Sequence, residues 1–165
     1  LTGTYSYLKA TYEENGLLFG ERSVQAKPGM RLPGIPENVF RLRVDWAPQD
    51  VLKIGVTVIA TSDLVTQGNE DGLIGGDDDV VARDASVDGY QLVNVNMRYE
   101  QSSNLTIFAR ITNLFDEKYE TYGAMAESAF TSSGSFVNDD EGPTVNRFVA
   151  PGAPRGIFIG LNYTF

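Results

Sequence analysis

The chain has 165 residues, and its 22 acidic residues outnumber its 13 basic ones, which gives a net charge of −9. This balance argues against a basic nucleic-acid-binding surface, and the absence of cysteine and histidine excludes disulfides, Cys/His zinc sites and Cys or His catalysis. The opening residues show no basic and apolar signal peptide, and no window has the apolar length of a membrane-spanning helix.

Apolar and polar side chains alternate along about six segments, a pattern that separates the two faces of a β-strand. The first segment, residues 2–13, is rich in Tyr and Thr and has the weakest alternation. Residues 40–46 show the pattern most clearly, with apolar side chains at even positions and charged ones between them. The same alternation predicts further strands at 52–60, 91–100, 105–112 and 156–165.

The connections between these predicted strands alternate in length. Residues 47–50 and 101–103 are short turns, whereas residues 14–38, 61–90 and 113–155 are long connections. Short periplasmic turns and long extracellular loops are typical of outer-membrane barrels, whose strands need roughly ten residues to cross at a tilt. We therefore expect an all-β protein in which about six long strands form an antiparallel up-and-down meander.

Aromatic side chains on the apolar face gather near the short turns. Such rings favour the level where hydrocarbon meets the lipid headgroups, so they predict an interfacial belt. Ordinary packing in a soluble core is the alternative. The predicted lipid-interface aromatics are Trp46, Tyr99, Tyr163 and Phe165.

Residues 113–120 have the sequence Asn-Leu-Phe-Asp-Glu-Lys-Tyr-Glu and follow the predicted strand 105–112. This stretch resembles the Asn-Leu-Phe-Asp-x-x-Tyr signature that follows the next-to-last strand of TonB-dependent outer-membrane receptors. The Pro-Gly-Ala-Pro-Arg segment at 151–155 and the Leu-Pro-Gly-Ile-Pro segment at 32–36 also resemble that family. The motif residues are Asn113, Leu114, Phe115, Asp116 and Tyr119.

The resemblance implies that residues 1–165 are the C-terminal segment of a transmembrane barrel of about 22 strands. The plug domain and the earlier strands would then be absent from this chain. The family is located in the Gram-negative outer membrane, is not enzymatic, and takes up a scarce ligand with energy from TonB. That ligand is typically a ferric siderophore, and sometimes cobalamin, haem or a glycan.

The same resemblance implies the partners and cofactors. The expected partners are outer-membrane lipid, the small ligand, the barrel-assembly machinery and, through the intact receptor, TonB and the plug domain. Neither a cofactor nor a nucleic acid is expected.

The last predicted strand is similar to the signal that outer-membrane proteins present to the assembly machinery. An unpaired edge strand that ends in an aromatic residue can be captured by addition to another sheet. The signal residues would be Ile157, Ile159, Leu161, Tyr163 and Phe165.

The polar face of the predicted strands would line the lumen of such a barrel. Any single charged side chain there is adequately explained as part of the hydrated inner surface of the barrel. We hypothesise that the arginines as a group contact the plug through charge-assisted hydrogen bonds. The lumen-facing or plug-facing candidates are Arg41, Arg43, Asp45, Lys53, Asn94, Asn96, Arg98, Glu100 and Arg110.

Acidic runs punctuated by glycine occupy the long connections at 69–72, 77–79 and 138–142. Oxygen-rich loops suit Ca²⁺, and Asp77, Asp78 and Asp79 are weak candidates, although the spacing of an EF-hand is missing. Because like charges repel one another, we expect solvated loops rather than a metal site.

Two alternatives belong to other classes of protein. One is a soluble β-rich binding or interaction module whose apolar strand faces are buried in a sandwich or an oligomer. The other, an outer-membrane hydrolase, is disfavoured because the chain has no histidine. In a receptor barrel a single meander would turn one row of apolar side chains outward, whereas in a sandwich that row would face a second sheet. The row is Val44, Val56, Val95, Ile107 and Leu161.

Overall fold

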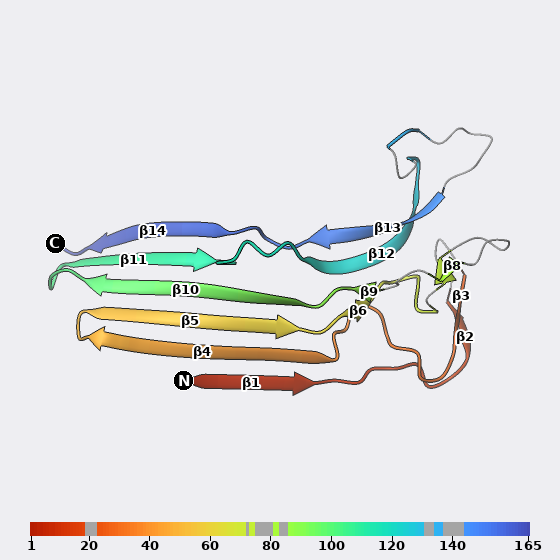
Figure 1. Cartoon of the computed structure of the whole chain (residues 1–165), viewed down its shortest axis with the longest axis horizontal. Helices are drawn as coiled ribbons and strands as arrows, with labels where there is room; N and C mark the ends of the chain where they lie inside the picture. Colours follow the sequence, from red (N-terminus) through yellow and green to blue (C-terminus); the bar gives the residue numbers. More distant parts are fainter. Residues whose placement is uncertain (19–22, 72, 75–80, 83–85, 131–133, 137–143) are drawn as a thin grey trace.

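The computed structural model describes residues 1–18, 23–71, 73–74, 81–82, 86–130, 134–136 and 144–165 (Figure 1). Every regular element within these residues is a β-strand. Among the same residues, no helix is long and apolar enough to cross a membrane. Six long strands are β1 (Thr2–Tyr7), β4 (Asn38–Gln49), β5 (Leu52–Thr61), β10 (Tyr90–Glu100), β11 (Leu105–Thr112) and β14 (Gly156–Tyr163).

These six strands form one sheet in the order β1-β4-β5-β10-β11-β14, and every neighbouring pair is antiparallel. Figure 1 shows the short turns at one end of the sheet and the long connections at the other. The predicted antiparallel meander is therefore confirmed.

The pairing register keeps the same set of side chains on one face across the sheet. Val44 lies opposite Val56, Val56 opposite Val95, Val95 opposite Ile111, and Ile111 opposite Ile157. Directly opposed residues share a face, so this row forms one apolar surface. Val44 is 41% exposed and Ile157 is 64% exposed. In the described part of the chain no second sheet packs over this face, as a sandwich would require.

Strand β1 ends at Tyr7, six residues before the predicted end of the first segment. The N–H of Leu8 still donates to the carbonyl of Glu37 at 2.9 Å, but regular pairing stops there. Pro33 and Pro36 lie in the returning segment, and proline has no N–H to donate to a ladder. The prolines that precede β4 thus explain the shorter strand.

Strand β4 continues to Gln49, so the predicted turn at 47–50 begins later than expected. An irregularity in the β4–β5 register between Trp46 and Gln49 accommodates the extra residues. The predicted turn at 101–103 is confirmed, because β10 ends at Glu100 and β11 begins at Leu105.

Shorter strand pairs lie within the long connections. Within residues 113–155, which were predicted as a long connection, β12 and β13 form a hairpin. This hairpin carries the chain past the ends of β11 and β14 (Figure 1). The pairs are β2 (Gly16–Leu18) with β3 (Val24–Ala26), β6 (Leu64–Val65) with β9 (Ser86–Val87), β7 (Leu73–Ile74) with β8 (Val81–Ala82), and β12 (Glu120–Ser128) with β13 (Thr144–Pro151).

The Asn-Leu-Phe-Asp motif forms the junction between the long sheet and the β12–β13 hairpin. Asn113 and Asp116 have φ angles of 50° and 57°, in the left-handed region that Asn and Asp tolerate better than most residues. The Asn113 amide donates to the carbonyls of Glu117 (2.8 Å) and Ala153 (3.1 Å) and accepts from the Glu117 N–H (2.8 Å). Asp116 accepts from the N–H of Arg155 at 2.9 Å. These side-chain bonds link the two chain segments where the regular β11–β14 pairing has ended.

A ring and a glycine close the other side of this junction. The N–H of Gly152 donates to the carbonyl of Tyr119 at 2.7 Å, and any β-carbon at Gly152 would overlap the Tyr119 ring. The ring of Tyr119 lies 4.4 Å from that of Tyr90, centroid to centroid, which restricts its movement. The close approach of the two segments thus depends on glycine at position 152.

We expect Asn113→Ala in the intact barrel to lower the free energy of unfolding by about 1–3 kcal/mol, because two carbonyls lose a buried donor. Urea unfolding of the purified receptor in detergent measures the change. Asn113→Asp keeps the acceptor but loses both donations, so it should be at least as destabilising. Asn15→Ala, at an exposed position, is the matched control. Wild-type stability of Asn113→Asp would show that the donated bonds do not hold the junction.

Candidate functional site

The polar face of the sheet carries five cations, and two of them are paired within their own strands. Arg43 contacts Asp45 at 2.7 Å, and Arg98 contacts Glu100 at 3.2 Å. Each pair joins residues two apart, which share a face of a strand. Both pairs are largely exposed, so they add little stability but neutralise the guanidinium charges.

A hollow of about 410 Å³ lies on this polar face. Arg41 and Arg43 reach it from β4 and Arg110 reaches it from β11, so arginines border it on both sides. None of its lining residues is acidic. The lining residues are Arg41, Arg43, Thr57, Ile59, Asn94, Val95, Asn96 and Arg110.

Two asparagines of β10 form the floor of this hollow. Asn94 accepts from the backbone N–H of Asn113 at 2.9 Å, which links the floor to the motif junction. Asn96 lies over Gly55 of the neighbouring strand, where a β-carbon would come within 2.5 Å of the Asn96 Oδ1. Glycine at position 55 therefore leaves room for an amide that lies across the sheet.

The nine residues predicted to face the lumen share this polar face, as the register shows. Arg43 lies opposite Thr57, Thr57 opposite Asn94, and Asn96 opposite Arg110. Thr57, Ile59 and Val95 also line the hollow, and sequence reasoning missed all three, having placed Val95 in the apolar row. Ile59 carries a signal in hindsight, because it interrupts the polar alternation of its strand. That this face lines a lumen remains a prediction.

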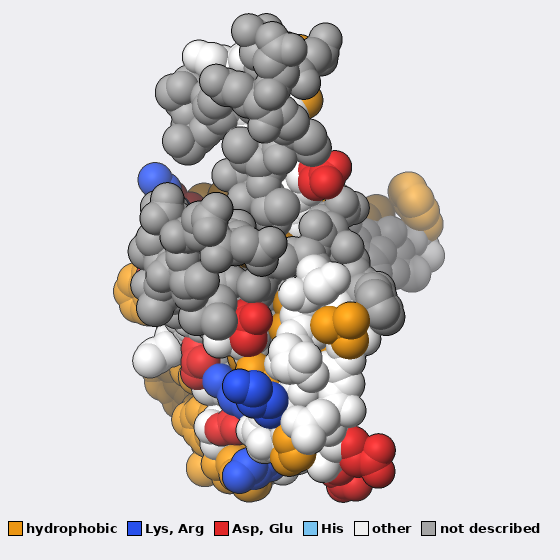
Figure 2. Space-filling view, turned by 90° about the vertical axis from the view of Figure 1, so that its right-hand side faces the viewer, with side chains coloured by type: hydrophobic (Ala, Val, Ile, Leu, Met, Phe, Trp, Pro, Cys, Tyr) orange, Lys and Arg blue, Asp and Glu red, His pale blue; other side chains and the backbone are white. Residues whose placement is uncertain are grey.

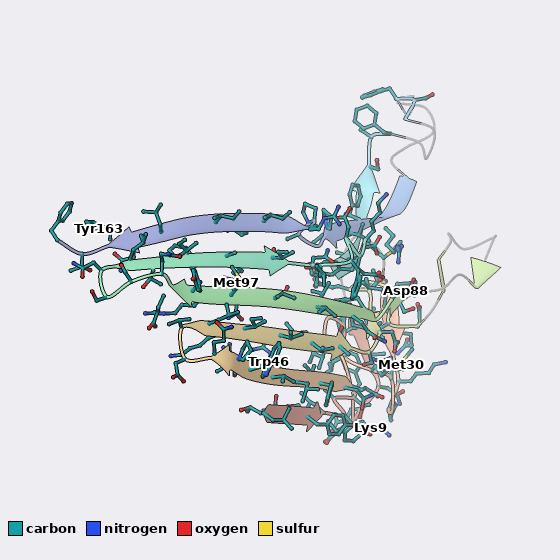
Figure 3. All side chains as sticks on the ribbon, turned by 60° about the vertical axis from the view of Figure 1, so that its left-hand side comes forward. Lys9, Met30, Trp46, Asp88, Met97 and Tyr163 are labelled. Atoms are coloured by element: carbon teal, nitrogen blue, oxygen red, sulfur yellow. The ribbon has the colours of Figure 1, made fainter. Side chains whose placement is uncertain are left out.

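The aromatics predicted to form an interfacial belt lie toward the turn end of the apolar face. Trp46 and Tyr163 are 61% and 53% exposed, and both lie away from the loop end (Figure 3). The rings of Tyr163 and Phe165 meet edge to face with centroids 5.2 Å apart. Their contact with lipid stays a prediction.

The apolar side chains that are buried in the described residues belong to strands of the long connections, namely β3, β6, β9 and β12, not to the six-stranded sheet. Gly123 lets β12 approach this region closely, since a β-carbon there would come within 2.8 Å of Val87 and 2.9 Å of Thr66. We call the packed loop region the rim cluster. Its buried apolar residues are Val24, Ala26, Leu64, Val87 and Met125.

Hydrogen bonds join three long connections within the rim cluster. Arg31 donates to the Asp63 carboxylate at 2.7 Å, which ties the connection before β4 to the one after β5. The backbone of Gln67 accepts from Met125 at 2.8 Å, and the Tyr122 hydroxyl donates to its side chain. At this end of the molecule, charged side chains of both signs lie close together (Figure 2).

The expectation of a solvated acidic run at 69–72 is wrong for its first residues. Asn69 is fully buried, and the Glu70 carboxylate accepts from the N–H of Gly68 at 3.1 Å. Burial first, and the charge of Glu70 second, raise the pKa of the Tyr12 phenol. The first residues of the run therefore pack into the rim cluster rather than extending into solvent.

The weak calcium candidates Asp77, Asp78 and Asp79 lie outside the described residues, as does the acidic run 138–142. Within the described ranges, no three acidic side chains come together as a metal site.

The family model described as "TonB dependent receptor-like, beta-barrel" matches residues 1–114. A comparison with curated proteins returned no match. The matched range holds five of the six long strands, all but β14, and it ends inside the Asn-Leu-Phe-Asp motif.

Solved outer-membrane receptors share the fold. The siderophore receptor PiuA from Acinetobacter baumannii matches 98% of this chain with a TM-score of 0.68 and 16% identity, over 19% of its own length. The ferric-catecholate import receptor Fiu from E. coli K12, in its closed form, matches 99% with a TM-score of 0.61 and 22% identity, over 18% of its length. The ferric yersiniabactin uptake receptor FyuA from Yersinia pestis matches 82% with a TM-score of 0.52 and 16% identity, over 17% of its length.

The chain thus spans about a fifth of the length of these receptors. Barrels of this type lie in the outer membrane of Gram-negative bacteria, and the solved relatives are transport receptors rather than enzymes. On the family match and the shared fold, the chain belongs to the TonB-dependent receptor β-barrel family.

Proposed function

We propose that this chain is the C-terminal barrel segment of a receptor that takes up a scarce ligand with energy from TonB. The observation that carries the proposal is the single antiparallel sheet with two contrasting faces. One face is apolar, with exposed side chains on β4 and β14 and no second sheet over it in the described residues, and the other is polar and hollowed. That combination suits a wall between lipid and an aqueous lumen.

Each face then has a distinct role. The apolar face contacts lipid, with Trp46, Tyr99, Tyr163 and Phe165 at the periplasmic interface. The polar face lines the lumen and contacts the plug domain supplied by the rest of the receptor. The rim cluster forms part of the extracellular mouth. None of these roles requires a catalytic group.

A ferric siderophore is the ligand that we propose. Support comes from the structural relatives, which are described as receptors for siderophores, for ferric catecholates and for ferric yersiniabactin. Exposed aromatics in the β12–β13 connection, such as Phe130 and Phe136, would suit an aromatic or apolar part of such a ligand. Their rings meet edge to face with centroids 5.7 Å apart.

Deletion of the gene for the intact receptor should abolish uptake of at least one radiolabelled ferric siderophore by iron-starved cells. Deletion of TonB should have the same effect, because the proposed transport depends on its energy. The measurement is uptake of a panel of ferric catecholates, ferric hydroxamates, haem and cobalamin.

Restoring the receptor gene is the control for uptake. Siderophore uptake that continues without TonB would contradict the energised mechanism. A response limited to haem or cobalamin would contradict the proposed ligand while leaving active transport in place.

The C-terminal aromatic offers a separate test of assembly. Phe165→Ala should lower the amount of folded receptor in the outer membrane several-fold, because the edge strand would be captured less well by the assembly machinery. The fraction of receptor that shifts in mobility on heating measures folding. Phe136→Ala removes another exposed aromatic, away from the terminal strand, and should leave that fraction unchanged. Equal loss in both variants would argue against a terminal signal.

A further inference from the structure

Two arginines of the hollow lack the partner that other arginines of the same face have. Arg43 and Arg98 each have an acidic residue two positions later, on the same face of their strands. Arg41 has Arg43 at that position, and Arg110 has Thr112. Strand geometry thus leaves both guanidinium groups without an acidic neighbour along their own strands.

Neither Arg41 nor Arg110 has a hydrogen-bond or ion-pair partner among the described residues. The other side chains of the hollow also offer hydrogen-bond donors to a bound molecule. Asn94 already uses its Oδ1 to accept from the Asn113 N–H, so its amide NH₂ is the group left for an occupant. With no acidic residue in the lining, cations and amide donors dominate the hollow. Like charges on one concave surface repel, and a bound anion would offset that repulsion.

We propose that Arg41 and Arg110, with the amides of Asn94 and Asn96, form a carboxylate-binding site on the lumenal wall. The proposal rests on the proposed function in one respect, since it places this face inside a barrel. Guanidinium groups bind carboxylates through paired, planar hydrogen bonds. The same face already shows that chemistry, because Arg43 donates from Nε and an Nη to the Asp45 carboxylate at 2.7–3.0 Å.

The bound carboxylate could come from two sources. One is an acidic side chain of the polypeptide that fills the barrel, and the other is a small carboxylate that passes through it. A volume of about 410 Å³ accommodates either an Asp or Glu side chain or a molecule such as citrate. The arginines stand on β4 and β11 with two strands between them, so one occupant must bridge them or two carboxylates must bind.

The intact receptor carrying Arg110→Lys tests the site, because a carbodiimide joins an amine to a carboxylate in contact with it. We expect the amine introduced at position 110 to couple several-fold more than the exposed Lys27 of the same chain, by peptide mass spectrometry. Coupling to another peptide of the receptor identifies a polypeptide source. Addition at position 110 of the mass of citric acid less one water, after incubation with citrate, identifies a small-molecule source.

A second variant tests whether the two arginines act together. Adding Arg41→Gln to Arg110→Lys should reduce the coupling several-fold, whereas adding Lys9→Gln, which removes one exposed cation and keeps Lys27 as the reference, should not. The heat-modifiable band shows whether each variant is folded. Coupling at position 110 no greater than at Lys27, or unaffected by Arg41→Gln, would overturn the site.

The experiments distinguish failure of the proposed transport function from failure of the proposed carboxylate site. Coupling at position 110 of the Arg110→Lys receptor, with no TonB-dependent uptake by the wild-type receptor, contradicts the transport proposal alone. Normal TonB-dependent uptake by the wild-type receptor, without coupling in the Arg110→Lys variant, contradicts the carboxylate site alone.

Discussion

Backbone groups that cross the hydrocarbon layer have no water to bond with, so every amide must pair with a neighbouring strand. This constraint requires a continuous ladder, whose register is set by the apolar pattern and the turns, and the register in turn decides which side chains share each face. A slip of one residue in any strand would send its apolar side chains to the polar face. The row from Val44 through Val56 and Val95 to Ile111 shows that four strands place their apolar residues on the same face. The separation of apolar and polar surfaces depends on this shared register.

The long strands were predictable because their signal is local. Alternation within residues 52–60 or 105–112 marks a two-faced strand without knowledge of its neighbours, and turn length orders the strands into a meander. The same alternation put all nine polar-face candidates on one side. The hollow itself was not predictable, since it needs side chains from four strands to meet, and Ile59 lines it against the pattern.

The rim cluster escaped prediction for a different reason. Apart from β12, its strands are two or three residues long, too short for a period to be seen. Its contacts join positions far apart in sequence, such as Gln67 with Gly123, and no local composition marks them. The motif at 113–116 was recognisable as a family signature. Its physical role, which is to link segments through left-handed residues and a buried amide, required the coordinates.

In the proposed receptor, where these connections form part of the mouth of the barrel, the bonds from Arg31, Gln67 and Tyr122 also bear on how that mouth can move. Loops that share a packed core open in one cooperative step, whereas independent loops open one by one. Any force on one of these three connections is therefore transmitted to the other two. This sector of the mouth would behave as a stiff plate, and closure around a ligand would fall to loops carried by other strands of the barrel.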